Sequence, residues 1–113
     1  MPTHTSLVKL FALLLITAAT ACGAAPPPVA LPASTPENVS AGEKEFQRAC
    51  ASCHGAAAEG GKTAPALADE VGHHDDAFLI DVMLKGHEAM PPADVTQPQA
   101  ELVMVWLRSR FKK

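Results

Sequence analysis

The sequence predicts an all-α domain with three main helices, preceded by a signal segment and a proline-rich tether. Apolar residues recur at helical spacing in the middle and at the end of the chain, and residues that cap helices stand before both segments. No stretch of useful length alternates between apolar and polar residues as a strand would. Aromatic residues make up only 4% of the 113 residues, so we expect the helices to need more than their own side chains to build a core.

Residues 1–21 have the features of a secretory signal segment. A weakly basic start with Lys9 merges into an apolar run from Leu7 to about Ala19, and small residues follow. The run is too short for the roughly 20 apolar residues of a membrane-spanning helix. We therefore expect a protein that is exported to the periplasm of a bacterium.

Cys22 stands directly after this segment, in the sequence ATAC. The stretch resembles a bacterial lipobox, which implies that lipid is attached to Cys22 and anchors the domain to a membrane. Signal peptidase could instead cut after Ala21 and leave an incidental cysteine. Lipid attachment is favoured, because an exported chain whose other two thiols are used elsewhere would otherwise carry a free reactive thiol.

The tether comprises residues 22–38, which hold five of the ten prolines and no periodic apolar pattern. In the polyproline conformation it would reach about 50 Å when fully extended. We expect none of it to join a core, and we place the folded domain at residues 39–113.

The first helix of the domain is expected to begin at Ser40. Ser40 at the N-cap and Glu43 three positions later match a capping box, in which their side chains satisfy the first free backbone donors. The helix then runs directly into Cys50. We expect long loops over residues 55–74 and 86–95, which hold most of the glycines, prolines and histidines of the domain.

The other two main helices carry their own end signals. The second begins with Asp75 or Asp76 as the N-cap and ends at Gly86. The third follows Thr96, with Gln99 at the third helical position and a proline tolerated in the first turn.

The strongest chemical motif is CASCH at residues 50–54. A structural zinc site would need two of the histidines beside both cysteines, but His54 is difficult to bring round the same small ion as Cys53. A redox dithiol of the thioredoxin type would need strands, which the sequence does not offer. Covalent haem c accounts for every position, because Cys50 and Cys53 would form thioethers and the helical turn would let His54 ligate iron. The macrocycle would also supply the missing core.

Four stretches of the folded part extend this interpretation. They are GEKEFQRACASCH, APAL, LKGHEAMPP and ELVMVWLRS, in that order along the chain. Residues 39–113 thereby resemble a class I monohaem cytochrome c, which implies the small cytochrome c fold wrapped around one haem. The resemblance also implies that the carbonyl of Pro65 accepts a hydrogen bond from Nδ1–H of His54. It further implies a close helix crossing at Gly42, Phe46 and Trp106.

The second axial ligand could come from six side chains: Met83, Met90, Met104, His73, His74 and His87. Met83 and Met104 stand at core spacing within helices, where a packed methionine is the ordinary role. Met90 lies in a loop bounded by glycine and proline, at the place where the resemblance implies the distal methionine. We therefore predict Met90, with His87 as the chief alternative; two histidine ligands would lower the reduction potential.

Two filled axial positions leave iron no open site for a substrate, so we expect a one-electron carrier and no enzyme. Its partners would be redox proteins that bind transiently within a periplasmic or membrane-associated respiratory chain. Removal of Lys9 with the signal leaves eight Lys and Arg residues against twelve Asp and Glu residues, and no basic patch suggests nucleic acid.

Two other functions remain open. The first is a cytochrome subunit bound permanently to a dehydrogenase or oxidase, because the unbroken apolar run Leu102–Leu107 cannot all face one core and hints at an exposed patch. The second is a haem sensor or peroxidase, in which Met90 would be a labile ligand.

Overall fold

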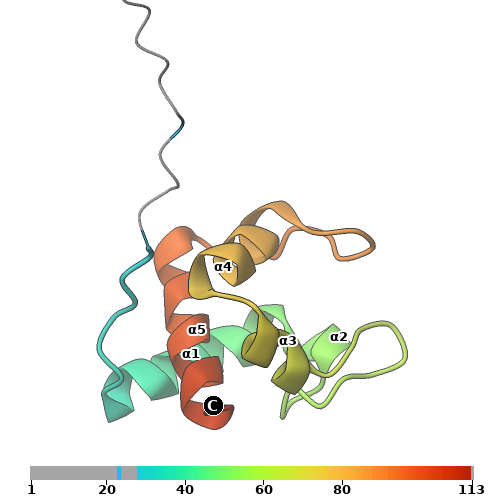
Figure 1. The fold of residues 1–113 in the computed structure, drawn as a ribbon. Coiled ribbons are helices and arrows are strands. Elements are labelled where there is room, and N and C mark those ends of the chain that lie inside the picture. Colours follow the sequence, from blue (N-terminus) through green and yellow to red (C-terminus); the bar gives the residue numbers. More distant parts are fainter. Residues whose placement is uncertain (1–22, 24–27, 113) are drawn as a thin grey trace, which may run out of the picture.

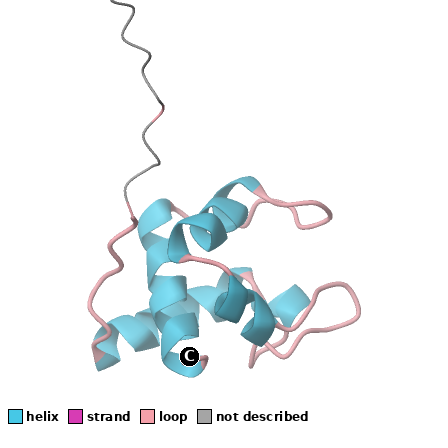
Figure 2. Cartoon of the chain, in the orientation of Figure 1, coloured by secondary structure: helices cyan, strands magenta, loops and turns pink. Residues whose placement is uncertain are grey.

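The structure is a computed structural model that describes Gly23 and residues 28–112. The expected signal segment and Cys22 lie outside the described residues. Helices and loops make up the described part, without a strand, as the predicted all-α class requires (Figure 2). The helices are α1 (Pro36–Ala49), α2 (Ala51–His54), α3 (Leu67–His73), α4 (Asp76–Lys85) and α5 (Gln97–Arg110), and Figure 1 shows their arrangement.

The first helix begins earlier than the sequence predicted. Thr35 is its N-cap, with the side-chain hydroxyl accepting a hydrogen bond from the backbone N–H of Asn38 at 3.2 Å. Pro36 occupies the first turn, where its missing N–H costs nothing. The predicted N-cap at Ser40 is therefore wrong, because the TPEN segment supplies an adequate cap one turn upstream and Ser40 falls inside the helix.

Part of the expected tether packs on the domain. Val29 and Leu31 are half-buried against the core, while Ala30 between them is exposed. The carbonyl of Ala33 accepts hydrogen bonds from the N–H of Thr35 and from the Asn38 side chain, both at 2.8 Å. We call residues 29–33 the strap, and Figure 1 shows it running along the side of the molecule to the start of α1. The expectation that no part of this segment joins the core is wrong for the strap.

The helix crossing implied by the resemblance is present between α1 and α5. A Cβ atom added to Gly42 would lie 2.0 Å from the carbonyl oxygen of Leu102, so only glycine permits this approach. Phe46 and Trp106 are both buried, and their ring centroids lie 4.5 Å apart at an interplanar angle of 36°. This pair locks the crossing on which the rest of the fold is built.

The predicted ends of the other two main helices are confirmed. The side chain of Asp75 accepts a hydrogen bond from the N–H of Phe78 at the start of α4, and Gly86 ends that helix with a positive φ of 79°. Thr96 and Gln99 form a reciprocal capping box at the start of α5.

The helix α3 lies within a segment that the sequence assigned to a loop. It is short, it has no side-chain N-cap, and it contains Gly72 one residue before its end. These features weaken the usual sequence signals of a helix, and only the acidic first turn of Asp69 and Glu70 and the basic last turn of His73 remain. Its buried residue is Val71, which joins the core.

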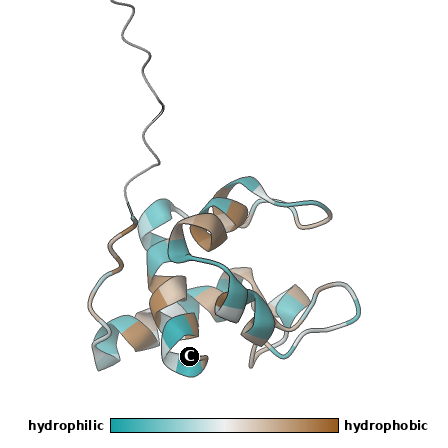
Figure 3. Cartoon of the chain, viewed as in Figure 1, coloured by the Kyte–Doolittle hydropathy of each residue, from teal (hydrophilic) through white to brown (hydrophobic). Residues whose placement is uncertain are grey.

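The apolar run in α5 is buried. The five residues from Val103 to Leu107 are all buried, because α1, α4 and the rest of the core cover more than one face of this helix. Figure 3 shows strongly hydrophobic residues on α5 and α4. The predicted exposed patch on this helix is therefore wrong, and Phe78 is the one large hydrophobic side chain exposed among the described residues. Within the same part of the chain, no helix has the length and apolarity needed to span a membrane.

Candidate functional site

A cavity of about 640 Å³ lies between the helices and the two long loops. Its walls come from α1, α2, α3, α4, α5 and the loop after α4, and most of the lining is apolar. Such a volume falls in the range of sites for cofactors and small ligands. Five residues singled out in the sequence line it together: Cys50, Cys53, His54, Pro65 and Met90.

The CASCH motif forms helical turns at the boundary between α1 and α2. The N–H of His54 donates to the carbonyl of Cys50 at 3.0 Å, and Cys50 and Cys53, three positions apart, both line the cavity. Both thiols are free; Cys50 is buried and Cys53 is exposed. Burial raises the pKa of the Cys50 thiol to about 11. The described residues form helices and no strand, so they lack the βαβ setting of a thioredoxin-type dithiol.

His54 is buried, with 7% of its surface exposed, and its Nδ1 lies 3.0 Å from the carbonyl oxygen of Pro65. A carbonyl only accepts, so Nδ1 must carry the proton and donate it. The neutral ring then keeps its lone pair on Nε2, which is the form of histidine that ligates a metal. The expected hydrogen bond to Pro65 thus fixes both the tautomer and the ring orientation.

The loop after the motif is tied to two helices. The side chain of Gln47 on α1 donates to the carbonyl of Ala56 at 2.6 Å, and the side chain of Arg110 on α5 donates to that of Ala57 at 3.1 Å. The carboxylate of Glu59 accepts from the N–H of Ala57 at 2.7 Å. These contacts hold the end of the CASCH motif in place, and no sequence pattern had indicated them.

Met90 sits in a tight turn whose backbone is fixed. His87 and Met90 exchange two backbone hydrogen bonds, at 2.9 and 2.8 Å. A Cβ atom on Gly86 would lie 2.6 Å from the Met90 carbonyl oxygen, and the positive φ of Gly86 also requires glycine. The N–H of Ala93 donates to the carbonyl of Met83 at 2.8 Å, which closes the loop back onto α4.

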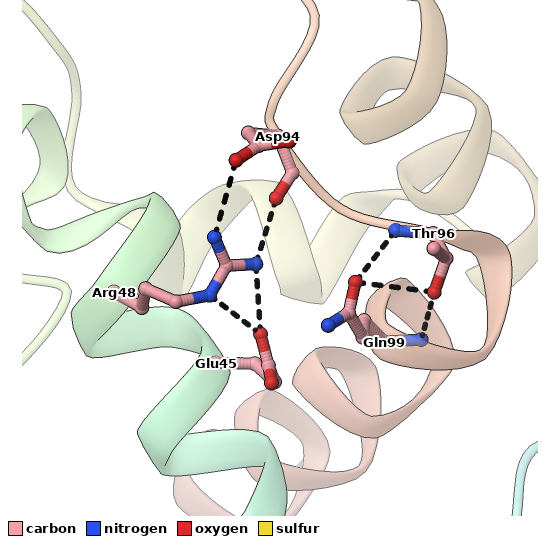
Figure 4. A network of polar contacts seen from close by, with 5 residues as sticks. All are labelled: Glu45, Arg48, Asp94, Thr96 and Gln99. Carbon is pink, nitrogen blue, oxygen red and sulfur yellow. Dashed lines mark hydrogen bonds and ion pairs between the residues drawn. The ribbon is translucent and has the colours of Figure 1, made fainter.

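Arg48 fastens the far end of this loop to α1 (Figure 4). Its guanidinium donates to the Asp94 carbonyl at 2.7 Å and lies 3.4 Å from the Asp94 carboxylate. Glu45, three residues earlier on α1, pairs with the same guanidinium at 2.9 Å. Two residues beyond Asp94, the capping box of Thr96 and Gln99 begins α5. The Met90 loop is therefore held at both ends, and sequence reasoning missed Arg48 because its partner is distant in the chain.

The other candidate ligands separate into two groups. Met83 and His87 line the cavity, whereas Met104, His73 and His74 do not. Met104 is fully buried in the core, and His74 stacks on Phe78 with centroids 4.3 Å apart. The part of the chain that the structure describes contains no group of three or more His, Cys, Asp or Glu side chains placed to hold a metal ion.

Comparisons with known proteins agree with this site. The profile of the family described as "Cytochrome C oxidase, cbb3-type, subunit III" matches residues 37–107, more than half of the chain. A comparison with curated proteins found no match.

A solved structure is also similar to this chain: cytochrome cL from the marine methylotrophic bacterium Methylophaga aminisulfidivorans MPT. The identity is 32%, the TM-score is 0.55, and the match covers 66% of this chain and 53% of that one. The chain thus spans about half the length of cytochrome cL. Helical architecture, motif and family match lead to one conclusion: the chain belongs to this family of c-type cytochrome domains, which bind covalent haem c and transfer electrons.

Proposed function

We propose that this protein is a monohaem one-electron carrier of a periplasmic or membrane-associated respiratory chain. Cys50 and Cys53 would hold haem c as thioethers, and His54 and Met90 would ligate its iron. The observation that carries the proposal is the cavity that these four residues line together.

The residues of the cavity fit such a group. Two thiols three positions apart that line one cavity match two thioethers, and a buried histidine with a free Nε2 lone pair matches a ligand to iron. The apolar wall from α4, with Leu79, Val82 and Met83, suits a flat apolar ring. When bound, the haem supplies an iron centre that exchanges one electron.

The chain's own residues tune that centre. The Pro65 carbonyl orients His54 and raises its basicity as a ligand. A methionine sulfur is a soft, neutral ligand that favours the ferrous state and raises the reduction potential. With both axial positions filled, no position remains for a substrate, so the proposed protein is a carrier and not an enzyme.

The proposed partners are redox proteins that bind transiently. Partner release must be fast in a carrier, and small, weakly polar contacts allow it. The proposed location is the periplasm, with a lipid on Cys22 as the membrane anchor.

A second candidate is a cytochrome subunit held permanently in an oxidase, and the match to the family of cbb3-type oxidase subunit III favours it. Mild detergent extraction of native membranes distinguishes the two functions. A carrier separates from oxidases during purification, whereas a permanent subunit stays with one oxidase at a fixed stoichiometry.

Covalent attachment is tested on protein expressed with a c-type maturation system. After denaturation and acid-acetone extraction, the haem should stay with the polypeptide. It should be extracted from the variant with both Cys50→Ser and Cys53→Ser, while Cys22→Ser, whose thiol lies outside the motif, keeps its haem. A colourless wild-type polypeptide would exclude the proposal. Carbon monoxide binding to the reduced protein at neutral pH would instead indicate a labile Met90 and a sensor or peroxidase.

A further inference from the structure

Arg108 joins three helices through one side chain. It lies in the last turn of α5, is half-buried, and uses all three nitrogens of its guanidinium. Nε donates to the Asp76 carboxylate at 2.8 Å, Nη2 donates to the carbonyl of His74 at 2.8 Å, and Nη1 donates to the carbonyl of Val71. All three partners fall within residues 71–76, which form the junction between α3 and α4.

Arg108 adds polar contacts to a junction at which α3 has little direct contact with other helices. The last carbonyls of a helix have no partner within it, and those of Val71 and His74 belong to the end of α3. The described helix contacts are extensive between α1 and α5 and between α4 and α5, whereas α3 has no comparable contact with another helix. Arg108 supplies the missing donors and ties α3 to α5 through charge-assisted hydrogen bonds.

The junction stands between the two sides of the cavity. On the N-terminal side of the junction, α3 begins two residues after Pro65, whose carbonyl accepts a hydrogen bond from His54. On the C-terminal side of the junction, α4 ends at its C-cap Gly86, which precedes the turn that holds Met90. Both helices contribute cavity walls, from Leu67 to Val71 on α3 and from Phe78 to Met83 on α4. A shift at residues 71–76 would therefore change the separation between the His54 side and the Met90 side.

We propose that Arg108 is a positioning residue for the haem site, because it fixes the α3–α4 junction that spaces His54 and Met90. The inference rests on the proposed axial ligands. Arg108 does not line the cavity, so it acts through the two helices that it holds. Loss of the Arg108 side chain would let α4 and the Met90 loop move. The bond between the Met90 sulfur and iron would then weaken, and the reduction potential would fall.

The test compares two variants of the holoprotein, each of which exchanges one cationic side chain for the other kind. Arg108→Lys keeps a positive charge near Asp76 but cannot serve both carbonyls, since an ammonium lacks the planar fork. Lys44→Arg is the control for an exchange of the same two cations, because Lys44 is exposed on α1 and does not line the cavity. The readouts are imidazole affinity of the ferric protein, reduction potential and the sulfur–iron absorption band, all measured well below the unfolding temperature.

Arg108→Lys should bind imidazole about tenfold more tightly than wild type, which corresponds to the loss of one charge-assisted hydrogen bond. Its potential should fall and its sulfur–iron band should disappear at a lower temperature. Lys44→Arg should match wild type. Equal imidazole affinity and potential in Arg108→Lys and wild type would overturn the proposal, and so would equal changes in both variants.

If Arg108→Lys yields no folded holoprotein, the same measurements are made on Asp76→Asn. It removes only the charged partner and should raise imidazole affinity by about threefold, since the two carbonyl contacts remain. An unchanged affinity and potential in this variant would then overturn the proposal. A wild-type protein without a sulfur–iron band would contradict the proposed Met90 ligand, which is a separate result from an unchanged variant.

Discussion

Gly42 lies where α1 crosses α5, and the space for a side chain there is taken by the Leu102 carbonyl, 2.0 Å from where a Cβ would stand. Two buried rings, Phe46 and Trp106, depend on the same approach. His54 is a similar case at the site, because its role depends on a single carbonyl at Pro65. At this scale, individual backbone carbonyls decide where side chains can stand.

The variant Gly42→Ala tests the close crossing. The added methyl must push α1 from α5, and we expect a loss of about 2 kcal/mol or more in the free energy of unfolding, despite the helix propensity of alanine. The control is Gly72→Ala in α3, where a Cβ meets nothing within 4 Å. Thermal unfolding compares the holoproteins of the two variants. Equal stability of Gly42→Ala and Gly72→Ala would show that the crossing has room for a methyl group.

At the scale of the element, the helix ends are set by side chains that satisfy free backbone donors. Asp75 and Thr96 do so where the sequence predicted them. Thr35 performs the same role for α1, although Ser40 had looked like the cap. Both residues are followed three positions later by a polar side chain, so the local pattern is ambiguous, and packing of the strap decides in favour of the longer helix.

A pair of hydroxyl deletions tests this correction. Thr35→Ala should lower the free energy of unfolding by about 1 kcal/mol, because it leaves the N–H of Asn38 without its acceptor. Ser40→Ala should have little effect or stabilise slightly, since alanine is favoured in a helix interior. Chemical denaturation of the holoprotein gives both values, and the opposite order would place the start of the helix at Ser40.

At the scale of the whole molecule, the strap shortens the free tether. With residues 29–33 held on the domain, only residues 22–28 would separate a lipid on Cys22 from the fold, a reach of about 20 Å instead of about 50 Å. A lipid-anchored domain would then stay close to the membrane surface.

Replacement of Val29 and Leu31 by serine tests the strap. The double variant removes half-buried apolar area and should lower the free energy of unfolding by about 1 to 3 kcal/mol. The haem spectrum should not change, because neither residue lines the cavity. Ala30→Ser, at the exposed position between them, is the control. Unchanged stability of the double variant would mean that the strap does not pack on the domain in solution.

Local signals explain what the sequence could predict. The CASCH spacing, the Gly86 and Pro91 that bound the Met90 loop, and the caps of α4 and α5 are all short-range patterns. The features that the sequence did not predict depend on contacts between residues that are distant in the chain. Arg108 reaches the α3–α4 junction 32 to 37 positions away, and Arg48 reaches Asp94 across 46. The burial of Val103–Leu107 likewise follows from how other elements surround α5, which no periodicity in α5 itself reveals.

The spectrum of the ferric holoprotein tests the central claim most directly. Wild type should show the charge-transfer band of a methionine sulfur on ferric iron, Met90→Leu should lack it, and Met83→Leu should retain it, although both methionines line the cavity. Absence of the band from wild type, or its loss in Met83→Leu with retention in Met90→Leu, would contradict the proposed pair of ligands.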